Sequence, residues 1–258
     1  MLELDRNERA VTFDVEWAPD WIVESIANQL SAAGVRSTWF ATHPSPLLQE
    51  LAAEPLFEVG LHPNFLPNST QGETPAHIME TMLNWFPNAK CVRTHSLFQS
   101  EKLLQSFAED FAIDVDCSIL LPRCEAVMPH TLAWTDIEPT IVRVPHIFQD
   151  NVHMAFDREW VLEDAEPKGD GLKVFDFHPL HILLNSRDMS SFRLLAGRKP
   201  FEKIQPADIE GLINDTTGVR DLFNVLVEKL ADQSSDTISG VVRRWQSVSN
   251  ETVNTEMC

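Results

Sequence analysis

Basic residues are scarce in this chain of 258 residues: 20 lysines and arginines stand against 39 aspartates and glutamates, a formal net charge of −19. A field of that sign repels phosphate backbones and anionic membrane surfaces. We therefore expect no nucleic-acid partner.

The sequence also has few cysteines and no long apolar run. Its four cysteines, Cys91, Cys117, Cys124 and Cys258, form no CxxC pair, and we expect reduced thiols. The first residues, MLELDRNERAVTF, contain no apolar run of signal-peptide length, and no stretch of about 18 apolar residues occurs. We expect a cytoplasmic protein without a membrane span.

The composition and the order of sequence patterns indicate one α/β domain. Hydrophobic residues make up 43% of the chain and charged residues 23%, as in ordinary globular proteins. Short β-rich runs alternate with helical patterns, which predicts a parallel sheet with crossover helices. We predict a distorted (β/α) barrel of about seven parallel strands within residues 1–246, and a polar tail, 247–258, that frays. The predicted strands lie in 10–14, 37–42, 56–62, 89–95, 112–118, 140–148 and 172–184, and the predicted helices in 21–34, 46–54, 76–86, 100–111 and 219–232.

Polar side chains gather where these strands end. Loops after the carboxyl ends of parallel strands converge, so ligand sites form there. A single polar residue at a strand end is weak evidence for a ligand site, whereas a full ring of such residues is stronger evidence. The ring consists of Asp14, Glu16, His43, His62, Asn64, Arg93, His95, Asp116, His146 or Asp150, Asp176 and His178.

Carboxylates and imidazoles of this ring have the chemistry of a divalent metal site. Zinc takes oxygen and nitrogen ligands at about 2.0–2.2 Å. Glu16 and His62, with His95 or Asn64, supply such atoms from neighbouring strands. Asp14 and Glu16 are two residues apart, so an extended segment points both to one face, where they share a cation or a proton. One could then be a ligand and the other the base that takes a proton from water, and the spacing fits either assignment.

His178 ends a strongly apolar strand, beside Asp176. A histidine there is either a core residue or the general acid that protonates a leaving amine. His181 follows it and either lines the same rim or forms a structural hydrogen bond. Arg93 could orient a carboxylate base through a buried ion pair.

These motifs resemble those of the polysaccharide deacetylase family, also called carbohydrate esterase family 4 or NodB-like enzymes, over residues 10–186. TFDVEWAPD resembles the first motif: Asp14 matches the catalytic base, and Glu16 replaces the metal-binding aspartate of the family. FEVGLHPNF resembles the second motif, where His62 matches the first metal histidine. RTHS resembles the third, where Arg93 matches the arginine that orients the base. DFHPLHILLN resembles the fifth, where His178 matches the catalytic acid.

The chain departs from the family pattern at two places. The family has a second histidine four residues after the first, where this chain has Leu66, so the third ligand comes from Asn64, His95 or a water. His95 and Ser96 stand where the third motif has proline and tyrosine, and the chain contains no tyrosine at all. The last backbone amide of that motif contributes to the family's oxyanion hole, a role that the resemblance gives to Ser96.

The resemblance also implies an aspartate of the fourth motif behind His178, for which Asp116 and Asp150 are candidates. The combination of EWAPDW, LHPNFLP, RTH and FHPLH resembles a divergent branch of deacetylases encoded in bacterial O-antigen biosynthesis clusters.

The resemblance implies hydrolysis of an N-acetyl amide on a sugar or oligosaccharide, with Zn²⁺ as the expected cation. Because no export signal is visible, the expected substrate is a nucleotide-linked or lipid-linked precursor in the cytoplasm. Two alternatives remain: an amidohydrolase for a non-carbohydrate C–N bond, and an inactive sugar-binding relative, although a mere binder gains nothing from an aligned base and acid. The residues expected around the substrate are Ser96, Asp150, His181 and Trp17.

Overall fold

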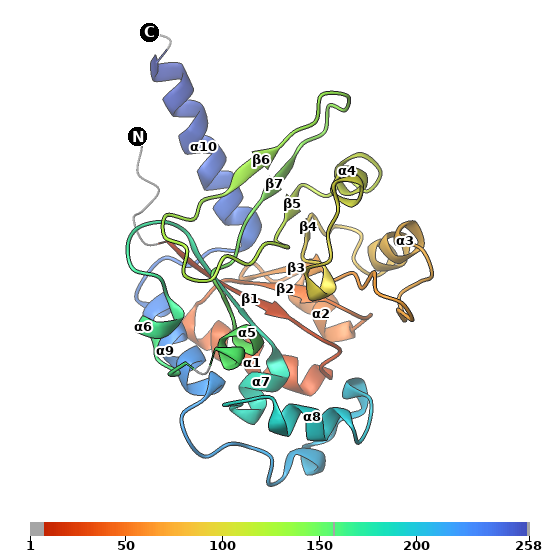
Figure 1. Cartoon of the computed structure of the whole chain (residues 1–258), viewed down its shortest axis with the longest axis vertical. Helices are drawn as coiled ribbons and strands as arrows, with labels where there is room; N and C mark the ends of the chain where they lie inside the picture. The colour runs from red at the N-terminus through yellow and green to blue at the C-terminus, as the bar shows by residue number, and fades with distance from the viewer. Residues whose placement is uncertain (1–7, 157, 257–258) are drawn as a thin grey trace.

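The computed structural model describes residues 8–156 and 158–256. Within these residues the centre of the molecule is one curled sheet of nine strands, in the order β6-β7-β5-β4-β3-β2-β1-β9-β8 (Figure 1). Neighbouring strands pair in parallel except β6 and β7, which are antiparallel. The strands are β1 (Arg9–Asp14), β2 (Ser37–Ala41), β3 (Phe57–Leu61), β4 (Cys91–Val92), β5 (Val115–Asp116), β6 (His130–Leu132), β7 (Ile141–Arg143), β8 (Phe148–Gln149) and β9 (Lys173–Phe177).

The sheet corrects the predicted strand count. Each of the seven predicted segments contains a strand, but the segment 140–148 contributes to two, β7 and β8. β7 pairs with β5 while β8 pairs with β9, so this bent segment connects the two ends of the curled sheet. β6 was missed because it has only three residues, none of them buried. The protein is therefore α/β as predicted, with nine strands in a partial barrel instead of about seven parallel strands.

Helices cover the outer face of the sheet (Figure 1). All the predicted helices are present, together with α10, which has 19 residues, and several shorter ones. The α-helices are α1 (Asp20–Ala33), α2 (Pro46–Leu51), α3 (Pro75–Trp85), α4 (Glu101–Glu109), α5 (Asp150–Ala155), α6 (Leu162–Ala165), α7 (Pro179–Leu184), α8 (Ser190–Ala196), α9 (Val219–Ala231) and α10 (Ile238–Glu256). The 3-10 helices are η1 (His95–Leu97), η2 (Phe201–Lys203) and η3 (Pro206–Ile209).

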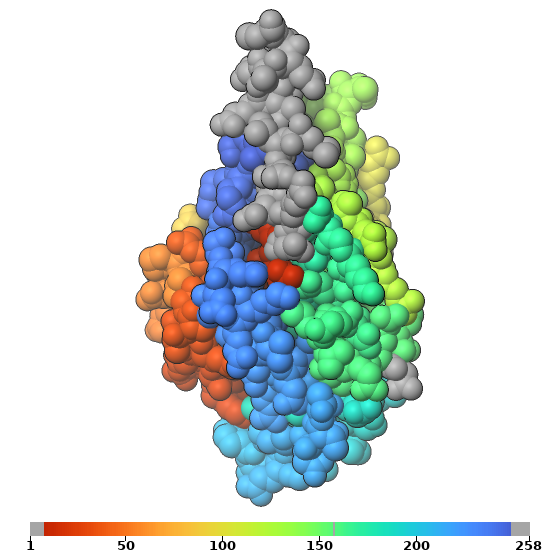
Figure 2. Space-filling model, turned by 90° about the vertical axis from the view of Figure 1, so that its left-hand side faces the viewer, coloured from red at the N-terminus to blue at the C-terminus, as the bar shows by residue number. Residues whose placement is uncertain are grey.

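Two helices show how the outer layer is built. α1 buries Ile22, Ile26 and Leu30 at helical spacing and ends at Gly34, whose φ of +67° suits a residue without a Cβ. α9 contacts α1, α6 and α7, and Figure 2 shows it in blue between the orange-red N-terminal residues and the green residues near α6. α10 extends through residues 247–256 of the expected polar tail, and residues 257–258 lie outside the described part.

The inner face of the sheet has an apolar end and a polar end. Side chains alternate along a strand, so Ala10, Thr12 and Asp14 of β1 share the inner face. Ala10 belongs to a buried apolar cluster that includes Ile238 and Val241 of α10, which close the end where the strands begin. Thr12 and Asp14 are also buried and lie toward the other end. Polar groups also occur where the strands begin, since Thr38 and Glu58 accept backbone N–H groups of α10.

In the described part of the chain, no helix is long and apolar enough to cross a membrane.

Candidate functional site

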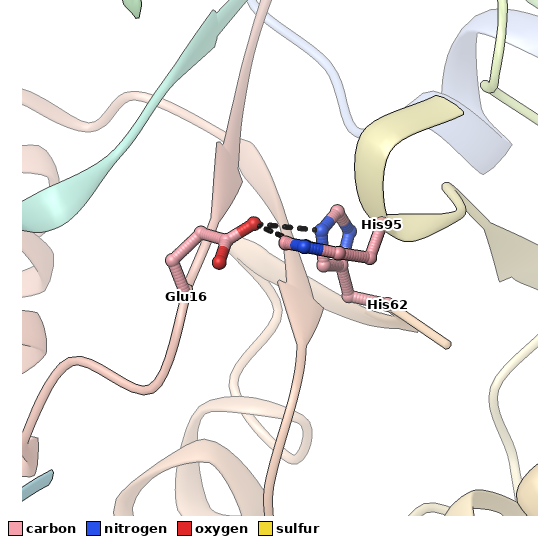
Figure 3. Close-up of side chains that lie close together, drawn as sticks. All are labelled: Glu16, His62 and His95. Atoms are coloured by element: carbon pink, nitrogen blue, oxygen red, sulfur yellow. Dashed lines mark hydrogen bonds and ion pairs between the residues drawn. The ribbon is translucent and has the colours of Figure 1, made fainter. Parts of the chain in front are cut away.

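Three side chains from three strand ends converge on one point (Figure 3). Glu16 follows β1, His62 follows β3 directly, and His95 begins η1 after β4. Oε1 of Glu16 lies 3.2 Å from Nε2 of His62 and 2.8 Å from Nδ1 of His95. One ligand atom of each residue lies within 4.8 Å of the others.

A turn places Glu16 in this cluster. β1 ends at Asp14, and Glu16 and Trp17 have φ values of +48° and +57°, an uncommon conformation for residues with a Cβ. The Trp17 N–H donates to Oγ1 of Thr42 at 2.9 Å, which ties the turn to the end of β2. The prediction that the extended segment continues through Glu16 was therefore wrong. The two carboxylates contact different nitrogens of His62, with Oδ1 of Asp14 lying 3.4 Å from Nδ1.

The donor atoms of Glu16, His62 and His95 fit a divalent cation. A carboxylate oxygen and two imidazole nitrogens are ligands that zinc prefers. His62 is 1% exposed, whereas the side chains of Glu16 and His95 are 16% and 22% exposed, so the cluster is accessible from one side. Burial alone would raise the pKa of Glu16, but the hydrogen bonds of His62 and His95 hold it well below its usual value. Glu16 is therefore an anionic candidate ligand.

Of the alternative third ligands, His95 lies in the cluster and Asn64 is engaged elsewhere. Oδ1 of Asn64 accepts the backbone N–H of Leu66 at 3.0 Å, within its own turn. The Asn64 N–H donates to Oε1 of Gln71, which fixes that turn.

Arg93 connects β4 to β1 and β9 across the inner face of the sheet. The guanidinium is fully buried and lies 4.4 Å from the centre of the Phe40 ring. Its Nη1 donates to Oγ1 of Thr12 at 2.9 Å, Oδ1 of Asp14 at 3.0 Å and Oδ1 of Asp176 at 2.5 Å.

Asp14 is ionised in this environment. Burial alone would raise the pKa of Asp14, but His62 and Arg93 together lower it below its ordinary value. An ionised carboxylate next to the Glu16, His62 and His95 cluster can accept a proton.

His178 is paired with Asp150, the first residue of α5. Oδ1 of Asp150 lies 2.6 Å from Nδ1 of His178, and Oδ2 accepts the His178 backbone N–H at 2.8 Å. Burial alone would lower the pKa of His178, but the Asp150 carboxylate raises it to about 10. Of the two candidates for this role, Asp116 instead accepts a hydrogen bond from Nε of Arg143 at 2.8 Å. His178 therefore carries a proton at neutral pH, and an atom of its ring lies within 4.8 Å of the carboxylates of Asp14 and Asp176.

His181 and Asp150 lie behind His178. His181 is 1% exposed, its Nδ1 lies 3.1 Å from Oγ of Ser186, and its ring packs against His178 and Phe192. Burial lowers the pKa of His181 to about 4, so its ring is neutral at pH 7. Asp150 is fully buried. Both residues contact His178, and their expected contact with a substrate stays a prediction.

Trp17 and Ser96 remain accessible beside the cluster. The Trp17 ring packs edge-on against His95, with ring centres 5.7 Å apart. Trp17 also lines a groove of about 650 Å³ together with His43, Asn64, Trp85, Phe201 and neighbouring residues. Ser96 is exposed and has a φ of +56° in the turn after His95.

His146, also a member of the predicted ring, is fully buried. Burial lowers its pKa well below the ordinary value. It does not belong to the Glu16, His62 and His95 cluster.

Sequence reasoning missed the link from Arg93 to Thr12 and Asp176. Thr12 pairs with Asp176 in the register of β1 and β9, so both face the inside of the sheet. The available signal was a polar residue in the middle of each of these two strands, at an inward position.

Comparison with known proteins places this chain in a family. A family model of WbmS-like polysaccharide deacetylases matches residues 11–196. A crystal structure of a candidate polysaccharide deacetylase involved in O-antigen biosynthesis, from Bordetella bronchiseptica, is 32% identical, with a TM-score of 0.76 over 87% of this chain and 91% of that one. The peptidoglycan deacetylase PdaC from Bacillus subtilis, at 13% identity and a TM-score of 0.52 over 100% of both chains, is similar in fold. No curated protein matches.

The chain therefore belongs to the polysaccharide deacetylase family, in its WbmS-like group. The resemblance identified from the sequence motifs is confirmed.

Proposed function

We propose that the protein hydrolyses the N-acetyl group of a sugar, with a divalent cation, Zn²⁺, held by Glu16, His62 and His95. The observation that carries this proposal is the placement of these three ligands beside an Arg93-bound carboxylate, Asp14, and an Asp150-bound imidazole, His178. A hydrolase for an amide needs these three functions together: an electrophile, a base and an acid.

The cation, when bound, supplies Lewis-acid polarisation of the amide carbonyl and of the attacking water. Asp14, ionised and fixed through Oδ1 by Arg93, takes a proton from that water. The N–H of Ser96 donates to the oxygen that becomes negatively charged as the water adds to the carbonyl carbon.

His178 completes the reaction as the general acid. It gives its proton to the amide nitrogen as the C–N bond breaks, so that the products are acetate and the free amine. Asp150 holds the ring in place and keeps it protonated before this step.

The proposed substrate is an N-acetylated sugar or oligosaccharide of surface-polysaccharide biosynthesis. The Bordetella relative, which is described as involved in O-antigen biosynthesis, supports that class. The groove beside Trp17 supports it as well, because Trp85 and Phe201 add aromatic rings and Asn64 adds an amide to its wall. Aromatic faces bind the apolar side of sugar rings, and amides bind hydroxyl groups.

The test is release of acetate from a panel of N-acetylated sugars and oligosaccharides, measured before chelation, after chelation and after return of one equivalent of Zn²⁺. We expect release that chelation abolishes and the metal restores. Metal-loaded protein that binds a sugar of the panel without releasing acetate would instead indicate an inactive sugar-binding relative. Release of a different amine from a non-carbohydrate amide would support the amidohydrolase alternative.

A further inference from the structure

β9 carries a buried carboxylate in the middle of its inward-facing row. All five residues of β9 are buried, and Asp176 shares the inner face with Val174 before it and with His178, which follows the strand. The side chain of Asp176 is fully enclosed, and its Oδ2 forms no hydrogen bond among the described residues.

Asp176 makes the shortest contact of Arg93. Nη1 of Arg93 lies 2.5 Å from Oδ1 of Asp176 and 3.0 Å from Oδ1 of Asp14. The hydroxyl of Thr12 lies between the strands, 3.2 Å from Oδ1 of Asp176 and 2.9 Å from Nη1 of Arg93. The guanidinium is thus held by Asp176 of β9 and Thr12 of β1, and it presents the same nitrogen to Asp14.

Packing alone does not account for a carboxylate at this position. Burying a second carboxylate beside one guanidinium costs free energy, because the carboxylate loses its contact with water. The same burial raises the pKa of Asp176, although the positive charge of Arg93 opposes the rise. An apolar side chain, as at Val174 or Phe177, would fill the same space without that cost. A group retained against such a cost, within 4.8 Å of both Asp14 and His178, points to a role in the reaction.

We propose that Asp176 is a positioning residue of the hydrolysis: it fixes the Arg93 guanidinium and, through it, the orientation of the Asp14 carboxylate. The contacts of Asp14 with Arg93 and His62 both use Oδ1. Holding Oδ1 in place leaves Oδ2 as the oxygen that takes the proton of the attacking water. This inference rests on the proposed function of Asp14 as the base.

The kinetic test compares Asp176→Ala, which removes the acceptor, with Asp176→Asn, which keeps an acceptor oxygen. We expect kcat of Asp176→Ala to fall at least about tenfold while KM changes less than about threefold, because misorientation of a catalytic group slows the chemical step. Asp176→Asn should recover most of kcat, and the metal content of both variants should equal that of the wild type.

A matched control is Asp116→Ala. Asp116 is also fully buried and also holds an arginine, Arg143, but it lies on β5, which pairs with β4 and β7 instead of with β1. It should keep the kcat of the wild type. Equal losses in Asp176→Ala and Asp116→Ala, or a kcat of Asp176→Ala within twofold of the wild type, would overturn the proposal. If Asp176→Ala does not fold, Thr12→Val removes the hydroxyl that contacts both Asp176 Oδ1 and Arg93 Nη1, and the same loss of kcat is expected.

A second measurement separates this proposal from the proposed function. The nitrogen NMR signals of the Arg93 guanidinium are assigned by their loss in Arg93→Lys. In the wild type and in Asp176→Asn, Nη1 and Nη2 should give separate signals. Rotation of the released guanidinium should average them in Asp176→Ala. If the wild type releases no acetate, the proposed function fails, and unchanged separate signals in Asp176→Ala would still show that Asp176 does not hold Arg93.

Discussion

Replacing Asp150 by asparagine keeps the size of the side chain and removes the charge that holds the proton on His178. The carboxylate raises the pKa of His178 both by its charge and by its hydrogen bond, whereas burial, the largest single influence, lowers it. Without the carboxylate we expect the pKa to fall from about 10 to near its ordinary value of about 6.5.

The size of the effect on activity follows from the protonated fraction of His178. A general acid must carry its proton, so activity is lost as the pH rises through its pKa. At pH 8.5 the wild-type ring is about 97% protonated, whereas a ring with a pKa of about 6.5 is about 1% protonated. At pH 6 both are mostly protonated. The ratio of kcat/KM at pH 6 to that at pH 8.5 should therefore rise by at least about 50-fold in Asp150→Asn relative to the wild type.

The assay is acetate release at substrate concentrations far below KM, between pH 6 and pH 9. A ratio taken within one variant does not depend on the amount of folded protein, so partial unfolding does not imitate the result. Asp116→Asn, whose partner is Arg143, is the control and should keep the wild-type profile. A basic limb that stays at the wild-type pH in Asp150→Asn would refute the assignment of His178 as the acid.

Two further substitutions test the base and the ligands. Asp14→Asn should fold normally, as measured by thermal denaturation, and lose about 10²-fold or more in kcat, because an amide cannot accept the proton of water; a near-normal rate would remove Asp14 from the mechanism. His95→Ala should lose bound zinc, measured by elemental analysis after dialysis, whereas Asn64→Ala should keep one equivalent, because Asn64 is engaged by Leu66. The opposite pattern would exchange the two residues as third ligand.

The sequence was informative where chemistry depends on position along a strand. Four of the predicted site residues stand at or beside a strand end: Asp14, His62, Arg93 and His178. Short apolar runs that alternate with helical patterns locate such strand ends well. The strand count was less accurate, because the segment 140–148 pairs with two different strands, and no local pattern records that.

The partners of these residues could not be predicted, because they depend on how loops far apart in the sequence meet. Asp116 and Asp150 are equally good candidates in the sequence, and only the pairing of β8 with β9 brings Asp150 to His178. The conformation of Glu16 is also invisible in the sequence, since a positive φ at a residue other than glycine has no local signature.

The central claim is that Glu16, His62 and His95 hold the catalytic cation, and anomalous diffraction at the zinc absorption edge tests it most directly. Crystals grown with zinc should show one strong peak about 2.0–2.2 Å from the ligand atoms of these three residues. A peak on the second group of potential ligands, Asp150, His178 and His181, would contradict the account, because it would make His178 a ligand instead of an acid.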